Sequence, residues 1–353
     1  MWKTTKIQIT FQPFVKSWAR LHPFWEYRFW TDASGEDFVK SVYPKYWDLF
    51  EGFNGIQRSD ALRYFILHHY GGVYADLDVE PVKPLDSMLN NTLTLSQEPL
   101  AHAVVLENRD RQVCNAFMAS PVGHPFWPYV HQYMNDHQIR QDPVGSTGPR
   151  MLDAALDAYN NIDFNKPTII PTKDQYSSIN HHNKNTQETA TTSRWGRGYG
   201  GWKGYRKKAR ANQKKTWEKV NLTEATWEEV YVAPPEEYMP LFDDKLNDFS
   251  QKCQKWGLSQ KQKDYCNVMK KRNYENRIED NTLTVHHWSH TWLGHVTEQD
   301  FIDVWDLVNS TKQRYLHNTH WNALLEGQAG YKNNVEAEGT TDDNDNENEN
   351  SEH

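Results

Sequence analysis

The chain has 353 residues, which suits one large domain or two modest ones with ample sequence for a core. Its formal net charge is −8, and this acidic balance argues against a duplex-DNA binder, which normally has a basic face. No apolar run reaches the roughly 18 residues that a membrane-spanning helix needs, and residues 1–10 lack the apolar core of a signal peptide.

The first 72 residues are predicted to contain three helices and one strand. Helical spacing of apolar residues predicts helices over 12–22, 34–43 and 55–72. The third has an apolar stripe and stops at a pair of glycines, Gly71-Gly72. Alternating aromatic residues predict a strand over 24–32.

From residue 73 onward, predicted strands and helices alternate. The expected strands cover 73–79, 93–96, 103–108, 115–120, 167–171 and 282–288. The expected helices cover 125–138, 149–160 and about 297–316. This alternation favours an α/β fold whose sheet has an open edge for a ligand.

Residues 181–280 interrupt this pattern and are expected to form a polar insertion. Its first part is Gly-containing and basic, with Lys and Arg clustered between 203 and 219. A solvated loop is the more frequent role for such a segment, and contact with an anionic acceptor or lipid headgroups is the alternative. Within the insertion, Cys253 and Cys266 can form a disulfide in an oxidising compartment. Residues 331–353 are expected to be a disordered acidic tail.

Asp76 and Asp78 follow directly after the glycine pair and form a D-x-D motif. If the backbone is extended there, both carboxylates point to one face and offer oxygen ligands to one cation. Mg²⁺ and Mn²⁺ sites are commonly built from one or two carboxylates plus substrate phosphates. An acidic surface turn is the alternative interpretation, because D-x-D occurs by chance in many proteins.

Other polar residues flank this motif in the sequence. Asp60 and Arg63 share one face of the predicted helix, either as an intrahelical ion pair or as a pair that reaches sugar hydroxyls. His286, His287 and His290 lie in the segment VHHWSHTW, which is not the H-E-x-x-H of metalloproteases. In a strand, His286 and His287 point to opposite faces, so at most one joins a given ion. A His cluster in the core or on the surface is the alternative.

The segment IQRSDALRYFILHHYGGVYADLDV resembles the DXD sugar-binding region of glycosyltransferase family 32. That family includes inositol-phosphoceramide mannosyltransferases and the yeast initiating α-1,6-mannosyltransferase. The residues that match its pattern are Arg58, Asp60, Arg63, Tyr64, Leu67, Gly71, Gly72, Tyr74, Asp76 and Asp78. Segments 115–126 and 146–156 are also similar, as is the pairing of His286 with Trp292.

The resemblance implies a GT-A type, Rossmann-like fold with a mixed central sheet that binds a nucleotide sugar. It implies that Asp76 and Asp78 are the catalytic residues and hold Mn²⁺ or Mg²⁺ together with His286. It further implies a donor-sugar-binding role for the matching residues Asp60, Arg63, Tyr74 and Trp2. The catalytic domain would then cover 1–180 and 281–330.

One departure from the family lies at the N-terminus. Family members open with a strand similar to I-P-x-x-I-H-Q-x-W-K, whereas here only Trp2 and Lys3 match. The strand that normally contacts the base is therefore expected to be missing, through truncation, with or without a membrane anchor, or through a misassigned start. Membrane attachment is expected only through such an anchor.

The expected function is a metal-dependent, retaining glycosyltransferase that moves a hexose, with mannose favoured. The donor would be GDP-mannose or a UDP-hexose, the acceptor a glycan, glycolipid or polysaccharide, and no nucleic acid is expected as a partner. The family implies the lumen of the Golgi or another secretory compartment. The first alternative is a non-catalytic protein that binds glycans or nucleotide sugars on the same fold. The second is a metal-dependent phosphodiesterase, which normally needs more clustered carboxylates and histidines.

Overall fold

The structure is a computed structural model that describes residues 2–88, 92–137, 142–162, 228–290 and 301–325. In the last of these ranges, side chains are described as far as residue 316. The predicted strand at 167–171, the basic segment at 203–219, Trp292 and the acidic tail lie outside the described residues.

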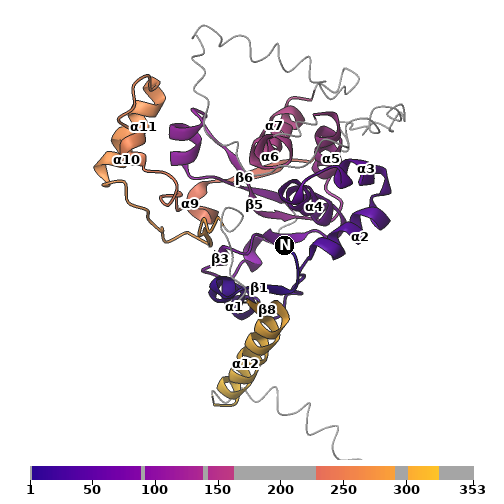
Figure 1. The fold of residues 1–353 in the computed structure, drawn as a ribbon. Helices are drawn as coiled ribbons and strands as arrows, with labels where there is room; N and C mark the ends of the chain where they lie inside the picture. Colours follow the sequence, from indigo (N-terminus) through magenta and orange to yellow (C-terminus); the bar gives the residue numbers. More distant parts are fainter. Residues whose placement is uncertain (1, 89–91, 138–141, 163–227, 291–300, 326–353) are drawn as a thin grey trace, which may run out of the picture.

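A mixed sheet forms the centre of the molecule (Figure 1). Its order is β2 (Gly72–Ala75), β5 (Val113–Ser120), β4 (Leu93–Gln97) and β6 (Val230–Ala233). β5 is antiparallel to both of its neighbours, whereas β4 and β6 are parallel. The predicted α/β class with a mixed central sheet is therefore confirmed.

Two smaller pairings join the beginning and the end of the chain to this centre. β1 (Lys6–Gln8) is antiparallel to β8 (Phe301–Asp303). β3 (Val79–Pro81) is antiparallel to β7 (Thr284–His286), and the register sets Val79 opposite His286. The second pairing brings the histidine segment to the D-x-D motif although about two hundred residues separate them in the sequence.

The five helices predicted before residue 161 are all present, with ends within two residues of the predicted ones. They are α1 (Gln12–Leu21), α2 (Asp32–Val42), α4 (Gly55–Tyr70), α5 (Phe126–Asp136) and α7 (Pro149–Asn160). The terminal helix α12 begins later than predicted and covers Val304–Leu325. Four further helices are short: α3 (Trp47–Glu51), α6 (Pro143–Ser146), α9 (Pro235–Tyr238) and α10 (Phe249–Lys252). Helix α11 (Gln260–Lys271) is longer. Single 3-10 turns lie at Ile9–Phe11, Pro44–Tyr46 and Asp86–Met88.

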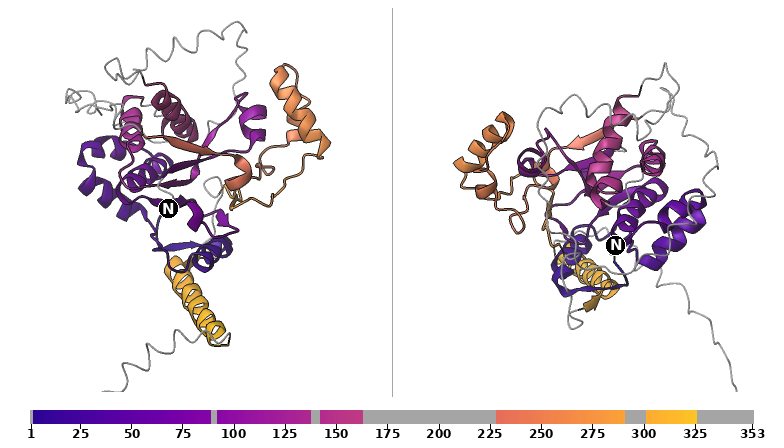
Figure 2. Two further views of the ribbon diagram at one scale, coloured as in Figure 1. Left: turned by 180° about the vertical axis from the view of Figure 1, so that it is seen from behind. Right: turned by 45° about the horizontal axis from the view of Figure 1, so that its top comes forward.

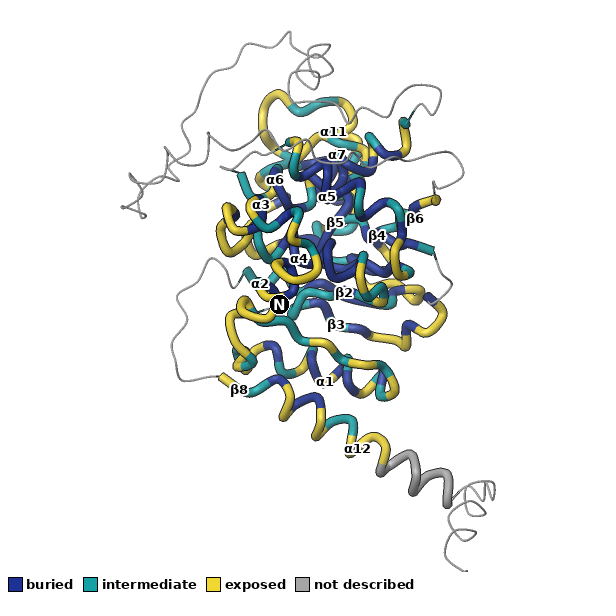
Figure 3. Tube along the Cα trace, turned by 90° about the vertical axis from the view of Figure 1, so that its right-hand side faces the viewer, coloured by how far each residue is buried: buried dark blue, intermediate teal, exposed yellow. Residues whose placement is uncertain are grey.

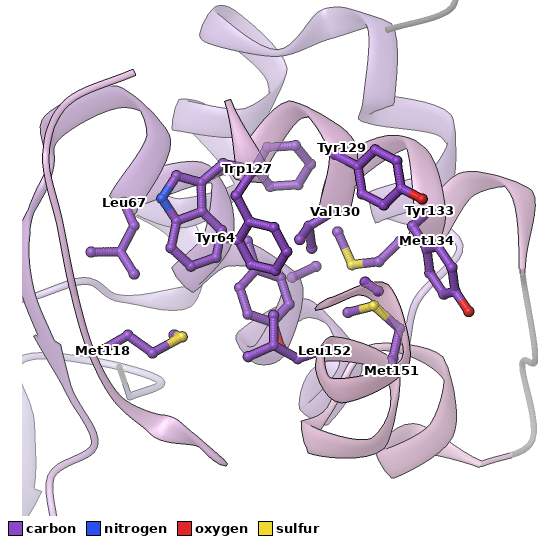
Figure 4. Close-up of a cluster of buried hydrophobic side chains, with 14 of the residues drawn as sticks. Tyr64, Leu67, Met118, Trp127, Tyr129, Val130, Tyr133, Met134, Met151 and Leu152 are labelled. Atoms are coloured by element: carbon purple, nitrogen blue, oxygen red, sulfur yellow. The ribbon is translucent and has the colours of Figure 1, made fainter. Parts of the chain in front are cut away.

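The largest apolar cluster lies between α4, α5, α7 and one face of the sheet (Figures 3 and 4). Tyr64 and Trp127 stack at its centre with their ring centroids 5.8 Å apart, and neither side chain is exposed. Every residue of β5 is buried, because α9 and β3 cover the other face of the sheet. The sheet and α4 therefore form a rigid support for residues at their ends.

Two predicted strands are wrong. Residues 24–30 form no strand, because their alternating aromatic side chains enter three different apolar clusters while the backbone has no ladder partner. Residues 101–106 (η4, Ala101–Leu106) form a π-helix instead of the strand predicted at 103–108. Such a short apolar run fits either a buried strand or a buried helical turn. Here Ala101 and Val105 of η4 pack in one apolar cluster with residues of α10 and α11.

The described part of the expected insertion is joined closely to the rest of the fold. β6 pairs with β4 of the central sheet, and Cys253 and Cys266 form a disulfide between the end of α10 and α11. Figure 2 shows α10 and α11 standing away from the sheet, on the opposite side from α12. Among the described helices, none combines the length and apolar character needed to cross a membrane.

Candidate functional site

The end of α4 fixes where the D-x-D motif begins. Gly71 caps the helix with φ of 62° and donates its N–H to the carbonyl of Leu67, 3.0 Å away. A Cβ at this position would lie 2.8 Å from the backbone nitrogen of Val122 and would be strained by the positive φ as well. Only glycine allows this close approach, which turns the chain directly into β2.

β2 ends at Ala75, and Asp76 to Val79 form a turn instead of the extended backbone considered from the sequence. The N–H of Val79 donates to the carbonyl of Asp76 at 3.0 Å, which closes the turn. Strand alternation therefore does not explain how the two carboxylates meet. Leu77 packs into the apolar cluster with Ile7 and Val304, and Asp76 and Asp78 approach one another beside it.

Asp76, Asp78 and His286 converge at this turn. One ligand atom from each lies within 4.8 Å of the others, so the three form a candidate cation site among the described residues. Two carboxylates and one imidazole suit Mn²⁺ or Mg²⁺ chemistry, with further positions left for water or phosphate oxygens. We call these residues the Asp-Asp-His cluster.

Asp78 and His286 form the tighter half of the cluster. His286 Nε2 lies 3.3 Å from Asp78 Oδ1, and the N–H of Ser289 donates to Asp78 Oδ2 at 2.8 Å. Burial alone would raise the pKa of Asp78, but His286 and the Ser289 amide hold it well below its usual range. Burial alone would lower the pKa of His286. The negative charge of Asp78 outweighs the effect of burial and raises this pKa. His286 Nδ1 is buried without a hydrogen-bond partner.

Arg63 and Tyr74 hold Asp76 from the opposite side. The Tyr74 hydroxyl donates to Asp76 Oδ1 at 2.5 Å, and Arg63 Nη1 lies 3.3 Å from the same oxygen. The Arg63 guanidinium also lies over the Tyr74 ring, 4.8 Å from its centroid, and donates to the Asn115 carbonyl at 2.8 Å. Asp76 thus has a fixed orientation before any ligand binds.

Asp60 lies behind Arg63 and is almost fully buried. Its carboxylate accepts from Arg63 at 3.1 Å, from the Asn115 amide at 3.0 Å and from the Thr147 hydroxyl at 3.2 Å. Burial raises the pKa of Asp60 to about 6, against the opposing effect of Arg63. The structure therefore joins Asp60, Arg63 and Asp76 in one buried network.

Sequence reasoning assigned no role to the two further partners of Asp60. Asn115 and Thr147 were not singled out as site residues, yet both donate to its carboxylate. Asn115 lies in segment 115–126 and Thr147 in segment 146–156. The similarity of these two segments to family 32 was the signal that could have identified both residues.

A strained loop carries His286 and its neighbours. Trp288 and His290 have φ of 47° and 49°, which bulky side chains rarely adopt. Trp288 Nε1 donates to the Leu241 carbonyl at 2.6 Å, and His290 Nε2 lies 3.0 Å from Asp243 Oδ2. The segment around Asp243 therefore holds this loop in place, a contribution that the sequence did not reveal.

His287 and Trp2 lie elsewhere. His287 Nε2 bonds to Glu80 Oε2 at 2.9 Å and its ring stacks on Phe14, so it does not join the Asp-Asp-His cluster. Trp2 packs edge-on against Phe11 and forms a single parallel bridge with Thr31. The contacts of both residues therefore lie outside the buried network around Arg63.

A cavity of about 330 Å³ opens beside Asp76. Its lining includes residues 25–30, residues 70–77, and Trp18 and His22 from near α1. In the described part of the chain, β2 pairs only with β5, and all four β2 residues line this cavity. The lining contains several aromatic side chains, and its charged members are Glu26, Arg28, Asp76 and Lys312.

Comparison with known proteins gives this geometry a family context. Residues 10–95 match the family model described as a glycosyltransferase sugar-binding region containing a DXD motif. The resemblance to glycosyltransferase family 32 is confirmed. The matched residues include α4, the glycine turn and both carboxylates of the Asp-Asp-His cluster.

Several curated proteins are similar to part of the chain. Inositol phosphoceramide mannosyltransferase 3 of Schizosaccharomyces pombe is 32% identical over 46% of this chain and 44% of its own length. Mannosyl phosphorylinositol ceramide synthase SUR1 of Saccharomyces cerevisiae is 36% identical over 39% of this chain and 35% of its own. The initiation-specific alpha-1,6-mannosyltransferase of Candida albicans is 21% identical over 51% and 57%. The matched part of the chain thus spans between 35% and 57% of the length of these relatives.

One solved structure, the PaToxG glycosyltransferase, is also similar to part of the chain. It aligns with a TM-score of 0.31 at 15% identity, covering 46% of this chain and 67% of that one.

Proposed function

We propose that the protein is a metal-dependent, retaining glycosyltransferase of GT-A type that transfers a hexose from a nucleotide sugar. The observation that carries the proposal is the convergence of Asp76, Asp78 and His286 within 4.8 Å, directly after the glycine turn of the matched DXD region. Mannose is the favoured hexose, because the similar proteins are named for mannosyl transfer.

The residues of the Asp-Asp-His cluster fit a divalent cation. Asp76 and Asp78 supply the oxygen ligands that Mn²⁺ and Mg²⁺ prefer, and His286 supplies a nitrogen acceptable to Mn²⁺. A bound cation would neutralise the negative charge that develops on the nucleoside diphosphate as it leaves. No strong protein acid is then needed beside the leaving group.

The surrounding residues orient the cluster. Arg63 and Tyr74 fix Asp76, while the Ser289 amide fixes Asp78. Such prior orientation keeps the cost of reorganisation low when charge develops in the transition state. Asp60, Arg63, Tyr74 and Trp2 remain our candidates for donor-sugar binding, and of these Arg63 and Tyr74 contact Asp76 directly.

The acceptor and the compartment are inferred from the similar proteins and from the disulfide. Two of the similar proteins are named for inositol phosphoceramide, so a glycolipid acceptor ranks beside a glycan. The Cys253–Cys266 disulfide suits an oxidising compartment, as expected for the Golgi lumen. The general test is a thermal-shift screen of GDP and UDP sugars with and without Mn²⁺. Stabilisation by every nucleotide irrespective of the metal would contradict the proposal.

His286, not His287, is expected to set the metal requirement. His286→Ala removes one ligand of the cluster, so the Mn²⁺ concentration for half-maximal stabilisation by a nucleoside diphosphate should rise roughly 10–100-fold. His287→Ala removes the contact with Glu80 and the stacking on Phe14, neither of which belongs to the cluster, and should leave that midpoint nearly unchanged. A shift of the midpoint in the His287 variant alone would contradict the assignment.

Asp60 is expected to recognise the sugar and not the nucleotide. Asp60→Asn removes the negative charge while keeping the shape, so the Kd for the nucleotide sugar should rise while that for the free diphosphate changes little. Calorimetric titration of both ligands in the presence of Mn²⁺ measures the difference. Equal losses for the two ligands would show that Asp60 acts only through Arg63.

A non-catalytic protein that binds nucleotide sugars on this fold is the alternative. The same titrations combined with a donor-hydrolysis assay distinguish the two functions. Metal-dependent binding without any release of free diphosphate, with water or with added acceptor, would favour the alternative.

A further inference from the structure

Residues 249–272 form a projecting lobe with an unusual surface. We call this segment, which contains α10 and α11, the basic lobe. It carries seven cationic residues, Lys252, Lys255, Lys261, Lys263, Lys270, Lys271 and Arg272, against the single acid Asp264, in a chain whose formal net charge is −8. Figures 1 and 2 show it standing away from the central sheet.

Trp256 lies in the turn between the two helices of the basic lobe and is completely exposed. A tryptophan normally buries most of its large apolar surface, so full exposure in a folded segment points to contact with something outside the chain. Val268 on α11 is half exposed, and Lys255 is exposed directly beside Trp256.

The turn that carries Trp256 is held in place. The Cys253–Cys266 disulfide closes the chain around it, and Cys266 and Met269 pack with Phe249 and Val105 in the core of the lobe. Gln262 Nε2 also donates to the Val105 carbonyl at 3.0 Å. An ordered turn loses little conformational entropy on binding, which favours a preformed docking surface.

The lobe core is connected to the candidate site through a series of rings. Phe249 stacks on His102 with centroids 5.9 Å apart, His102 contacts Trp288 at 4.6 Å, and Trp288 contacts His286 at 4.1 Å. The core of the basic lobe is therefore in packed contact with the loop that carries His286.

We propose that the basic lobe docks on an anionic lipid surface, with Trp256 entering the headgroup region. Tryptophan is enriched at membrane interfaces, where its ring is apolar and its N–H stays wet. Lysine and arginine close to an anionic leaflet each strengthen binding by about five-fold. The lobe thus combines an exposed tryptophan with an excess of cationic side chains, a pairing that suits the headgroup region of an anionic bilayer. This docking goes beyond the proposed transfer reaction and does not depend on it.

Vesicle flotation without donor or metal tests the proposal. The full chain should float with phosphatidylcholine vesicles containing about one quarter phosphatidylserine, and not with pure phosphatidylcholine, because the attraction is electrostatic. Raising the salt concentration should weaken binding. Trp256→Ala, which removes no contact within the protein, should lower the partition coefficient about ten-fold.

Matched variants separate docking from general changes in charge or folding. Lys270→Gln with Lys271→Gln should weaken binding to anionic vesicles, whereas Lys3→Gln with Lys16→Gln, an equal loss of charge elsewhere, should not. Phe24→Ala removes another exposed aromatic residue and should have no effect. The proposal is overturned if Trp256→Ala floats like the unaltered chain, if the two lysine pairs behave alike, or if the chain binds soluble polyglutamate but neither type of vesicle.

Discussion

Replacing both Asp76 and Asp78 with asparagine is expected to abolish the Mn²⁺-dependent thermal stabilisation of the protein by GDP or UDP. Asparagine keeps the volume and the hydrogen-bond acceptors toward Tyr74 and Ser289, but it removes both negative charges from the Asp-Asp-His cluster. A ligand at one hundred times its Kd stabilises the folded state by about 2.7 kcal/mol, so its loss is readily measured.

The control for this experiment is the double variant Asp37→Asn and Asp306→Asn. Both acids are exposed and lie outside the cluster, so the same change in net charge should leave metal-dependent stabilisation intact. The metal assignment would be wrong if the Asp76 and Asp78 variant still gained stability from GDP only when Mn²⁺ is present.

Arg63→Ala is expected to cause the largest loss of stability among single substitutions at the site. The Arg63 side chain is only 6% exposed and lies between two carboxylates, 3.1 Å from Asp60 and 3.3 Å from Asp76. Removing it leaves Asp60 buried without its cationic partner, and breaking a buried pair in this way typically costs about 3–5 kcal/mol. Chemical denaturation of the metal-free protein measures the change in the free energy of unfolding.

Two further variants provide reference values for the stability loss of Arg63→Ala. Arg28→Ala breaks the exposed pair with Glu26 and should cost less than about 1 kcal/mol. Arg63→Lys keeps the charge but loses the planar fork that reaches both carboxylates and the Asn115 carbonyl, so it should fall between the two. A cost for Arg63→Ala no greater than that for Arg28→Ala would mean that the buried network contributes little to the fold.

The sequence predicted the helices, and it named the three residues of the Asp-Asp-His cluster. It did not predict the backbone conformation that brings these residues together. α4 was predictable because good helix formers end at Gly71, where only glycine fits beside Val122. The link between His286 and the D-x-D motif came from the resemblance, and the β3–β7 pairing supplies its physical cause. The turn at Asp76 to Val79 could not be predicted, because it depends on the packing of Leu77 against residues from both ends of the chain, such as Ile7 and Val304. No local sequence pattern reveals such long-range packing.

Long-range contacts account for the other differences. Residues 24–30 have the period of a strand, but their aromatic side chains pack into three separate clusters and the segment joins none of the described sheets. β6 lies in a segment that composition marks as an insertion, yet its register with β4 places it in the central sheet. The support that Asp243 gives to the strained loop depends on two segments separated by 47 residues, which no local pattern reveals.

The free edge of β2 has a consequence for how the molecule associates. An edge strand presents alternate N–H and C=O groups that any extended backbone can satisfy, at a spacing of about 4.8 Å. β2 is an edge strand of the described sheet, and its four residues line the same cavity as Asp76. An extended segment that paired with this edge would lie beside Asp76, which directly follows the strand. The backbone edge that borders the candidate site is therefore also an edge at which another chain can extend the sheet.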